Sequence, residues 1–203
     1  LTGDGAVRHN RVVAFEEGRL IAWRPSEPDT PEPGHQWRWE IEPVEGGGHR
    51  LQLATFTPAN SIDAGSDASH DAGWSEPLTI ASGTGWFVNW ADIPHVVMAN
   101  DGALWAHWLQ KSAAAAYAYD IALVRSGDGG ANWSAPVLAN DDGTATEHGF
   151  VSLWPDGDDG IGIAWLDGRA TASTGHADPA GHAGAMSLRA AHFNAALDKS
   201  DDV

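Results

Sequence analysis

The sequence predicts an all-β protein, and composition, an internal repeat and a turn motif each support this fold class. Its 203 residues are enough for one domain of moderate size. They include 24 Gly, 11 Pro and 11 Trp, without a long amphipathic helical pattern. Short strands joined by frequent glycine and proline turns have this composition.

Two signatures recur along the chain with nearly the same period. A glycine followed by alternating apolar residues and an alanine begins at Gly18, Gly102 and Gly160, and the last two copies start 58 positions apart. A tryptophan followed by Ser, any residue and Pro begins at Trp74 and again at Trp133, 59 positions later. Independent features with one period indicate a repeating supersecondary unit.

The most specific motif is the octet from Ser126 to Trp133, Ser-Gly-Asp-Gly-Gly-Ala-Asn-Trp. Asp128 is expected to accept hydrogen bonds from N–H groups of its own turn. Gly130 permits a positive φ, and Trp133 supplies a large apolar ring at the start of the next strand. A shortened copy, residues 69–73, precedes Trp74. The motif predicts a tight turn between the third and fourth strands of a unit.

Each repeat is expected to contain four short antiparallel strands, the pattern of a β-propeller blade. About three blades are expected in one domain, 1–203, with blades at about 11–79, 94–138 and 150–193. The third blade lacks a convincing fourth strand, because residues 194–198 match the turn motif too poorly. The expected strands are 11–15, 19–23, 50–57, 74–79, 94–99, 103–109, 118–125, 133–138, 150–154, 161–166 and 186–193.

Long segments interrupt the repeat between the second and third strands of each unit, at 24–49, 111–117 and 170–185. In an antiparallel meander these loops, together with the links between units, lie on one face, opposite the tight turns. Loops on a rigid scaffold commonly carry functional groups. The residues expected on that face are Trp86, Trp90, Asp92, Lys111, Tyr117, Glu147, His148, Asp167, Arg169, His176 and His182.

Aromatic rings beside carboxylates and a few cations suit a sugar, and paired carboxylates suit glycoside hydrolysis. The candidate catalytic residues are Asp92, Glu147 and Asp167. The candidate substrate-binding residues are Arg169, His148, Trp90 and Lys111.

Each candidate also has a structural interpretation. Asp92 could cap its turn, and Glu147 with His148 could form an ordinary hydrogen-bonded pair. Asp167 and Arg169 could form an ion pair between blades, or Arg169 could hold a substrate carboxylate. If the carboxylates share one pocket, crowding of like charges is expected to raise the pKa of at least one of them.

The octet with Ser126, Asp128, Gly130 and Trp133 resembles the Asp-box, or BNR repeat, of the sialidase (neuraminidase) superfamily. The second unit is similar to a sialidase blade in the order of its segments, residues 90–94 followed by 101–106. The resemblance implies a six-bladed propeller, of which this chain would form about half. It also implies a glycoside hydrolase of the exo-alpha-sialidase type, and an extracytoplasmic or secreted location.

The sequence departs from the sialidase pattern at its active site. Asp92 stands where the family has an arginine that binds the substrate carboxylate, and Lys111 ends the segment that corresponds to the family's Glu-Gly-Arg. Residues 166–169, ending in Arg169, match that segment better. The family's Tyr–Glu nucleophile would belong to later blades. The resemblance covers nearly the whole chain for the fold, but only part of an active site.

Three functions therefore stay open: a sialidase-like glycoside hydrolase or a fragment of one, a non-catalytic Asp-box propeller that binds glycan or protein, and a scaffold without a ligand. Further blades, or self-association of the chain, are expected to cover the edges of an open half-ring.

Charge and composition argue against other classes of partner and cofactor. The net charge of −17 argues against binding to a nucleic-acid backbone. The absence of Cys excludes disulfide and thiolate chemistry, and no apolar run is long enough to span a bilayer. His176 and His182 lack a clear third ligand, and residues 140–143 lack the EF-hand spacing, so neither metal nor cofactor is expected.

Overall fold

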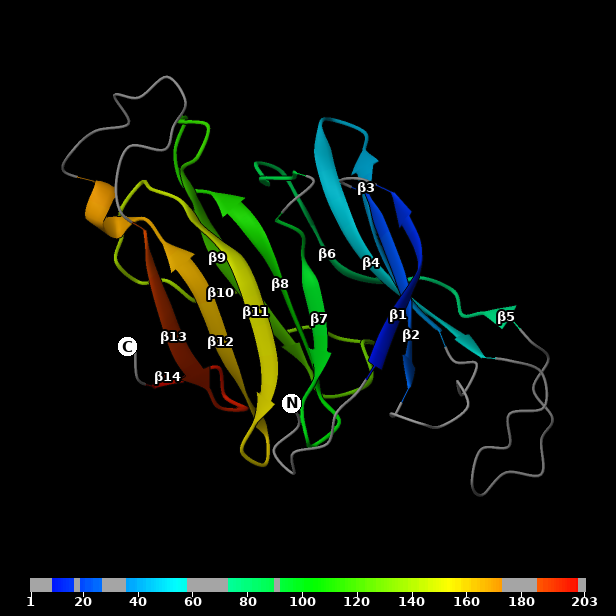
Figure 1. Ribbon diagram of the computed structural model, residues 1–203. Helices are drawn as coiled ribbons and strands as arrows, with labels where there is room; N and C mark the ends of the chain where they lie inside the picture. The colour runs from blue at the N-terminus through cyan, green and yellow to red at the C-terminus, as the bar shows by residue number, and fades with distance from the viewer. Residues whose placement is uncertain are drawn as a thin grey trace. The chain divides into compact units, whose positions relative to one another are not determined.

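The computed structural model describes residues 9–16, 19–26, 36–57, 73–89, 92–172 and 186–200. These residues form three antiparallel sheets, and their single helical segment is the short 3-10 turn η1, Arg169–Thr171 (Figure 1). The all-β prediction is therefore confirmed. The chain divides into two compact units, Leu1–Thr84 and Gly85–Val203. In the described ranges no helix has the length and apolar character needed to cross a membrane.

The first unit contains one six-stranded sheet with the order β1-β2-β3-β4-β5, and β6 pairs with β4 as well. The prediction that residues 24–49 are an insertion was wrong, because this segment contains β3, which pairs with both β2 and β4. Trp39 and Ile41 alternate with charged residues and are buried, which is the period of a strand. The strands are β1 His9–Glu16, β2 Leu20–Ser26, β3 Gln36–Val44, β4 Gly48–Thr57, β5 Gly73–Trp74 and β6 Leu78–Gly83.

The second sheet follows the expected meander, with the strand order β10-β9-β8-β7. The fourth strand is shorter than expected and begins at Val137, four residues after Trp133. The strands are β7 His95–Met98, β8 Leu104–Lys111, β9 Tyr119–Ser126 and β10 Val137–Leu138.

The third sheet has the order β11-β12-β13-β14, and it includes the fourth strand that the sequence did not predict. Asn194 Oδ1 accepts hydrogen bonds from the N–H groups of Ala196 and Asp198, both at 2.9 Å, which closes the turn that leads into β14. The backbone closes the same turn, because the N–H of Asn194 donates to the carbonyl oxygen of Asp198 at 3.1 Å. This turn therefore forms without the complete octet. The strands are β11 His148–Asp156, β12 Gly160–Asp167, β13 Ser187–Phe193 and β14 Lys199–Ser200.

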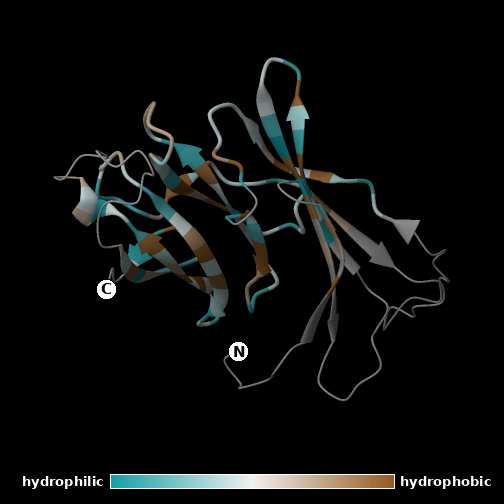
Figure 2. Ribbon diagram, turned by 45° about the horizontal axis from the view of Figure 1, so that its top comes forward, coloured by the Kyte–Doolittle hydropathy of each residue, from teal (hydrophilic) through white to brown (hydrophobic). Residues whose placement is uncertain are grey.

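The second and third sheets share one hydrophobic core. Trp105 and Ile121 of the second sheet and Ile161 and Trp165 of the third are completely buried in it. Figure 2 shows apolar residues along these strands and hydrophilic residues at their turns. Each such side chain stabilises the fold by about 1.5–3 kcal/mol. The core thus fixes the ends of β9, β11 and β12, where most of the candidate site residues lie.

The turn between β9 and β10 has the hydrogen bonds that the octet predicts. Asp128 Oδ1 accepts the N–H of Asn132 at 2.9 Å, and Ser126 Oγ accepts the N–H of Gly130 at 2.8 Å. Gly130 has a φ of 94°, and Trp133 Nε1 donates to its carbonyl oxygen at 3.1 Å. Hydrogen bonds from the side chain and backbone of Asn132 lower the pKa of Asp128 to about 2. The predicted contact between the Asp128 carboxylate and its own turn is confirmed.

Candidate functional site

The candidate residues of the second unit form two groups. Neighbouring residues of an extended chain point to opposite sides, and Glu147 and His148 are such neighbours. Glu147 comes directly before β11, and His148 begins it. Tyr119, Asp92 and Glu147 make up the Asp92 group. Residues around His148 make up the His148 network: Asp120, Asp142, His148, Asp167 and Arg169. Trp90, His176 and His182 lie outside the described residues.

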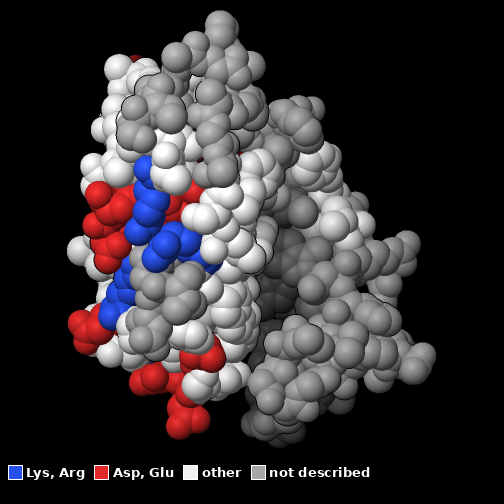
Figure 3. All heavy atoms as spheres, turned by 60° about the vertical axis from the view of Figure 1, so that its left-hand side comes forward, with Lys and Arg blue, Asp and Glu red and all other residues white. Residues whose placement is uncertain are grey.

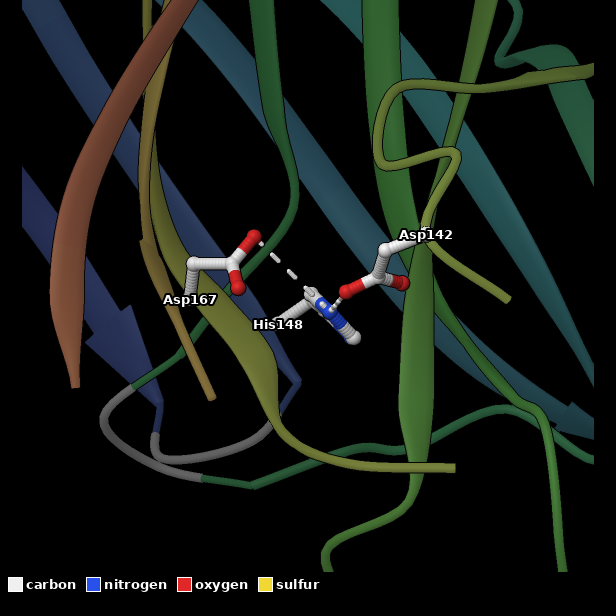
Figure 4. A group of neighbouring side chains, drawn as sticks. All are labelled: Asp142, His148 and Asp167. Carbon is white, nitrogen blue, oxygen red and sulfur yellow. Dashed lines mark hydrogen bonds and ion pairs between the residues drawn. The ribbon is translucent and has the colours of Figure 1, made fainter. Parts of the chain in front are cut away.

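His148 is completely buried at the centre of its network. Its Nδ1 lies 3.0 Å from the carbonyl oxygen of Tyr119, and its Nε2 lies 3.0 Å from Asp142 Oδ2. Both partners are oxygen acceptors. Asp167 Oδ2 lies on the other side of the ring, 3.8 Å from Nε2 (Figure 4). His148 therefore joins β9, the loop before β11 and the end of β12.

Arg169 binds Asp167 with a bidentate fork. Its Nε donates to Oδ1 and its Nη2 to Oδ2, both at 2.8 Å. Asp167 is also completely buried, and it accepts the indole N–H of Trp165 at 2.8 Å. Burial raises the pKa of Asp167, but the hydrogen bonds from Arg169 and Trp165 outweigh it and hold the pKa at about 2. Asp167 is thus ionised and hydrogen-bonded on both oxygens.

The His148 network also has the spacing of a metal site. Asp142, His148 and Asp167 offer ligand atoms that all lie within 4.8 Å of one another. However, Arg169 Nε lies 3.2 Å from Asp142 Oδ2, and the same guanidinium holds Asp167. This guanidinium supplies positive charge beside both carboxylates, as a metal ion would. Ion pairing therefore accounts for this cluster.

The surface beside the third sheet has a similar mixture of charges. Figure 3 shows a short band of Lys and Arg side chains bordered by Asp and Glu. Lys199 Nζ lies 3.2 Å from Asp141 Oδ2, which is one such pair. Among the described residues of this face, positive and negative side chains are therefore mixed.

Asp92 lies just before β7 and is almost completely buried, with 3% of its surface exposed. Its N–H donates to Asn89 Oδ1 at 2.7 Å, and its Oδ2 accepts the N–H of Phe150 at 2.9 Å. Burial is the main cause that raises the pKa of Asp92 to about 6. The Phe150 N–H opposes it, and the charge of Glu147 adds to it. This carboxyl group keeps a proton at a pH where ordinary aspartates have lost theirs.

Gly149 makes the contact between Asp92 and Phe150 possible. A Cβ at this position would lie 2.0 Å from Asp92 Oδ2, which is far inside a van der Waals contact. Only a glycine lets the buried carboxylate approach the β11 backbone so closely.

Glu147 is the second carboxylate of the Asp92 group, and a tyrosine orients it. The Tyr119 hydroxyl donates to Glu147 Oε1 at 2.8 Å. The Tyr119 ring is buried and stacks on Phe87 with the centroids 4.1 Å apart. Burial and the charge of Glu147 raise the pKa of Tyr119, so its hydroxyl stays protonated and donates. Lys111 lies at the end of β8 opposite Tyr119 in the strand register, with an exposed side chain.

A cavity of about 190 Å³ lies beside Asp92, lined also by Ile93, His95, Phe150 and Val151. Sites that enclose a complete ligand have volumes of about 300–1,000 Å³. The cavity therefore fits one part of a ligand, with the remainder outside it.

Phe150 was not among the candidate residues, although the repeat spacing in the sequence could have indicated its contact with Asp92. Asp92 and Phe150 are 58 positions apart, which equals the spacing of Gly102 and Gly160. They occupy equivalent positions in successive repeats, and equivalent positions meet where two repeats pack together. Asn100 and Gly157 are 57 positions apart and also meet, because the Asn100 side-chain amide donates to the carbonyl oxygen of Gly157 at 2.7 Å.

The first unit has a second cavity, of about 350 Å³, with three glutamates among its lining residues. Arg19 and Arg38 both form ion pairs with Glu40, which is largely buried. The arginines neutralise the most buried acid of this cavity. The lining residues are Arg38, Glu40, Glu42, Gln52, Ala54, Ser75, Glu76 and Pro77.

Comparison of the chain with models of known protein families and with curated proteins finds no match.

Proposed function

We propose that the protein is a sialidase-like glycoside hydrolase, or part of one, whose sheets are blades of an Asp-box propeller. The observation that carries this proposal is Asp92, a buried carboxyl group with a pKa of about 6 in the wall of a cavity. Glycoside hydrolysis needs an acid that is still protonated near neutral pH and a second carboxylate. Asp92 and Glu147 have these two properties, and the Asp-box turn supports the choice of family.

In this mechanism Asp92 is the general acid. Because its Oδ2 accepts the Phe150 N–H, we expect the acidic proton on Oδ1. The proton passes to the glycosidic oxygen as the bond between this oxygen and the anomeric carbon breaks. The leaving group departs as a neutral alcohol, and Asp92 becomes a carboxylate.

Glu147 is the second carboxylate of the mechanism. Its negative charge stabilises the positive charge that develops on the sugar ring. As water attacks the anomeric carbon, Glu147 takes up one proton of that water. The Tyr119 hydroxyl, 2.8 Å from Oε1, orients the carboxylate for both steps.

The His148 network has a supporting role in this proposal. The fork of Arg169 is already occupied by Asp167, so Arg169 holds the end of β12 in place of a substrate carboxylate. His148 fixes the start of β11, next to Glu147. The network thus positions one of the two reacting carboxylates.

The test is turnover of a panel of fluorogenic glycosides, sialosides included, by the full chain. Asp92→Asn and Glu147→Gln are each expected to lower kcat/KM by about 100-fold or more. Asp158→Asn, in the exposed turn between β11 and β12, is the control and is expected to leave it unchanged. A folded wild type without turnover on any glycoside would contradict the hydrolase.

The alternative is a non-catalytic propeller that binds glycan or protein through the same face. The small volume of the Asp92 cavity favours this alternative, since about 190 Å³ holds only part of a sugar. Binding of a glycoside without turnover would support it. In either case, further blades or self-association are proposed to complete the propeller.

A further inference from the structure

Phe150 has a backbone conformation that its own side chain does not explain. Its φ is +53°, in the left-handed region that bulky residues rarely adopt, and 48% of its surface is exposed. Leu197, with a φ of +65°, provides a contrast, because it lies in a closed turn and packs against the core. Phe150 is not among the residues that pack against this core. An unfavourable backbone at an exposed aromatic residue points to a function for that residue.

The preceding repeat holds Phe150 in this conformation. The register between β11 and β12 is interrupted between Gly149 and Ser152, so Phe150 lies in a bulge. Its N–H is free of the strand ladder there and donates to the buried carboxylate of Asp92. Bulges next to functional sites commonly redirect a side chain. Phe150 lines the same cavity as Asp92.

The cavity combines apolar walls with few polar groups, which is typical of ligand sites. Ile93, Val151 and Phe150 are apolar, and Asp92 and His95 are the polar members. Among the described residues, this lining has no lysine or arginine to bind a negatively charged group. An anionic substituent would instead meet Asp92, with Glu147 close enough to influence it. The chemistry of the lining therefore suits an uncharged ligand with one apolar face.

We propose that Phe150 is the platform on which the apolar face of a neutral pyranose ring stacks, and that the site takes neutral glycosides rather than sialosides. This inference rests on the proposed function and names its substrate class. The C–H groups of one pyranose face cover the aromatic ring, while the hydroxyl groups stay in water. The part of the ligand inside the cavity meets Asp92, which places the glycosidic oxygen near the general acid. Phe150 is thus a positioning residue, and Asp92 transfers the proton.

The experiment measures binding and turnover separately on the full chain. The probes are fluorogenic aryl glycosides of galactose, glucose and N-acetylglucosamine, and the corresponding sialoside. Phe150→Ala is expected to weaken binding and lower kcat/KM for a neutral glycoside by about tenfold. Phe150→Tyr keeps the ring and is expected to stay within about twofold of wild type.

Two controls separate stacking from folding. Leu138→Ala removes an equally exposed apolar side chain, 50% exposed on β10, and is expected to leave binding unchanged. Phe150→Gly accepts the positive φ without strain, so it is expected to melt no lower than Phe150→Ala and to bind equally weakly. Full binding by Phe150→Gly would overturn the stacking role.

The outcomes also distinguish this inference from the hydrolase proposal. Binding of neutral glycosides without turnover, weakened in Phe150→Ala, supports the platform and contradicts the hydrolase. Turnover that is insensitive to Phe150→Ala supports the hydrolase and contradicts the platform. Turnover of the sialoside alone contradicts the neutral substrate class, and the absence of binding to every probe contradicts both proposals.

Discussion

Replacing Asp92 by asparagine is expected to stabilise the fold at neutral pH while removing activity. The ordinary pKa of 3.8 and the pKa of about 6 at Asp92 differ by about two units, and each unit corresponds to about 1.4 kcal/mol. Keeping this buried group ionised at neutral pH therefore costs about 3 kcal/mol. An asparagine carries no charge, and its amide oxygen can still accept the Phe150 N–H.

The pH range of this effect follows from the direction of the pKa change. The folded protein binds the Asp92 proton more tightly than the unfolded chain, so stability falls as the pH rises from about 3.8 to about 6. The penalty is complete above that range and absent below it. The pKa of about 6 already includes the stronger hydrogen bond that the Phe150 N–H forms with the ionised carboxylate. The gain for Asp92→Asn at neutral pH is then the full penalty of about 3 kcal/mol.

The assay is thermal denaturation of wild type and Asp92→Asn at two pH values. Near pH 7.5 the variant is expected to melt about 6–12 °C higher, and near pH 4 the difference is expected to vanish. Asp158→Asn, an exposed carboxylate, is the control and is expected to show no such dependence. A lower melting temperature for Asp92→Asn at neutral pH, or a difference that is the same at both pH values, would refute the reasoning.

Three further substitutions test other parts of the structure. Arg169→Lys cannot reproduce the fork on buried Asp167, so we expect a loss of about 2 kcal/mol, measured as a lower melting temperature. Gly149→Ala inserts a methyl group against Asp92, so we expect the free energy of unfolding to fall by about 1–3 kcal/mol, measured by denaturation. Because the displaced carboxyl group is less buried, we also expect a lower pKa of Asp92, measured by the pH profile of turnover. Asp128→Ala removes the acceptor of its turn, so we expect a lower melting temperature with ligand binding unchanged. An unchanged melting temperature in Arg169→Lys or Asp128→Ala, or an unchanged pH profile in Gly149→Ala, would contradict the corresponding role.

The parts of the fold that depend on neighbouring residues could be predicted from the sequence. The turn at Asp128 is specified by side chains and glycines within one octet, so its hydrogen bonds follow from local chemistry. The strand β3 was missed because proline and glutamate around Trp39 concealed its alternation. The fourth strand of the third sheet was missed because its turn closes through Asn194 and the backbone, without the complete octet. Local patterns fail where a turn forms without its characteristic motif.

The candidate site depends on contacts between residues of different repeats. In the sequence, only the spacing between the repeats indicates such contacts. The sequence left two roles open for Arg169, because the choice depends on where Asp167 lies, and burial of Asp167 at the end of β12 is a tertiary property. The raised pKa of Asp92 has the same origin, since burial is its main cause. The equal spacing of the repeats and of the pair Asp92 and Phe150 was the available signal.

Two unfavourable features meet in one hydrogen bond at the junction of the second and third sheets. Asp92 lowers the stability of the folded protein because it is a buried acid, and Phe150 lowers it because its backbone is strained and its ring is exposed. Selection for folding alone would favour a neutral residue at the first position and a glycine at the second. Each feature gains a reason if a ligand uses it, the acid as a proton donor and the ring as a platform. The double variant Asp92→Asn with Phe150→Gly should accordingly be more stable than wild type at neutral pH, and inactive.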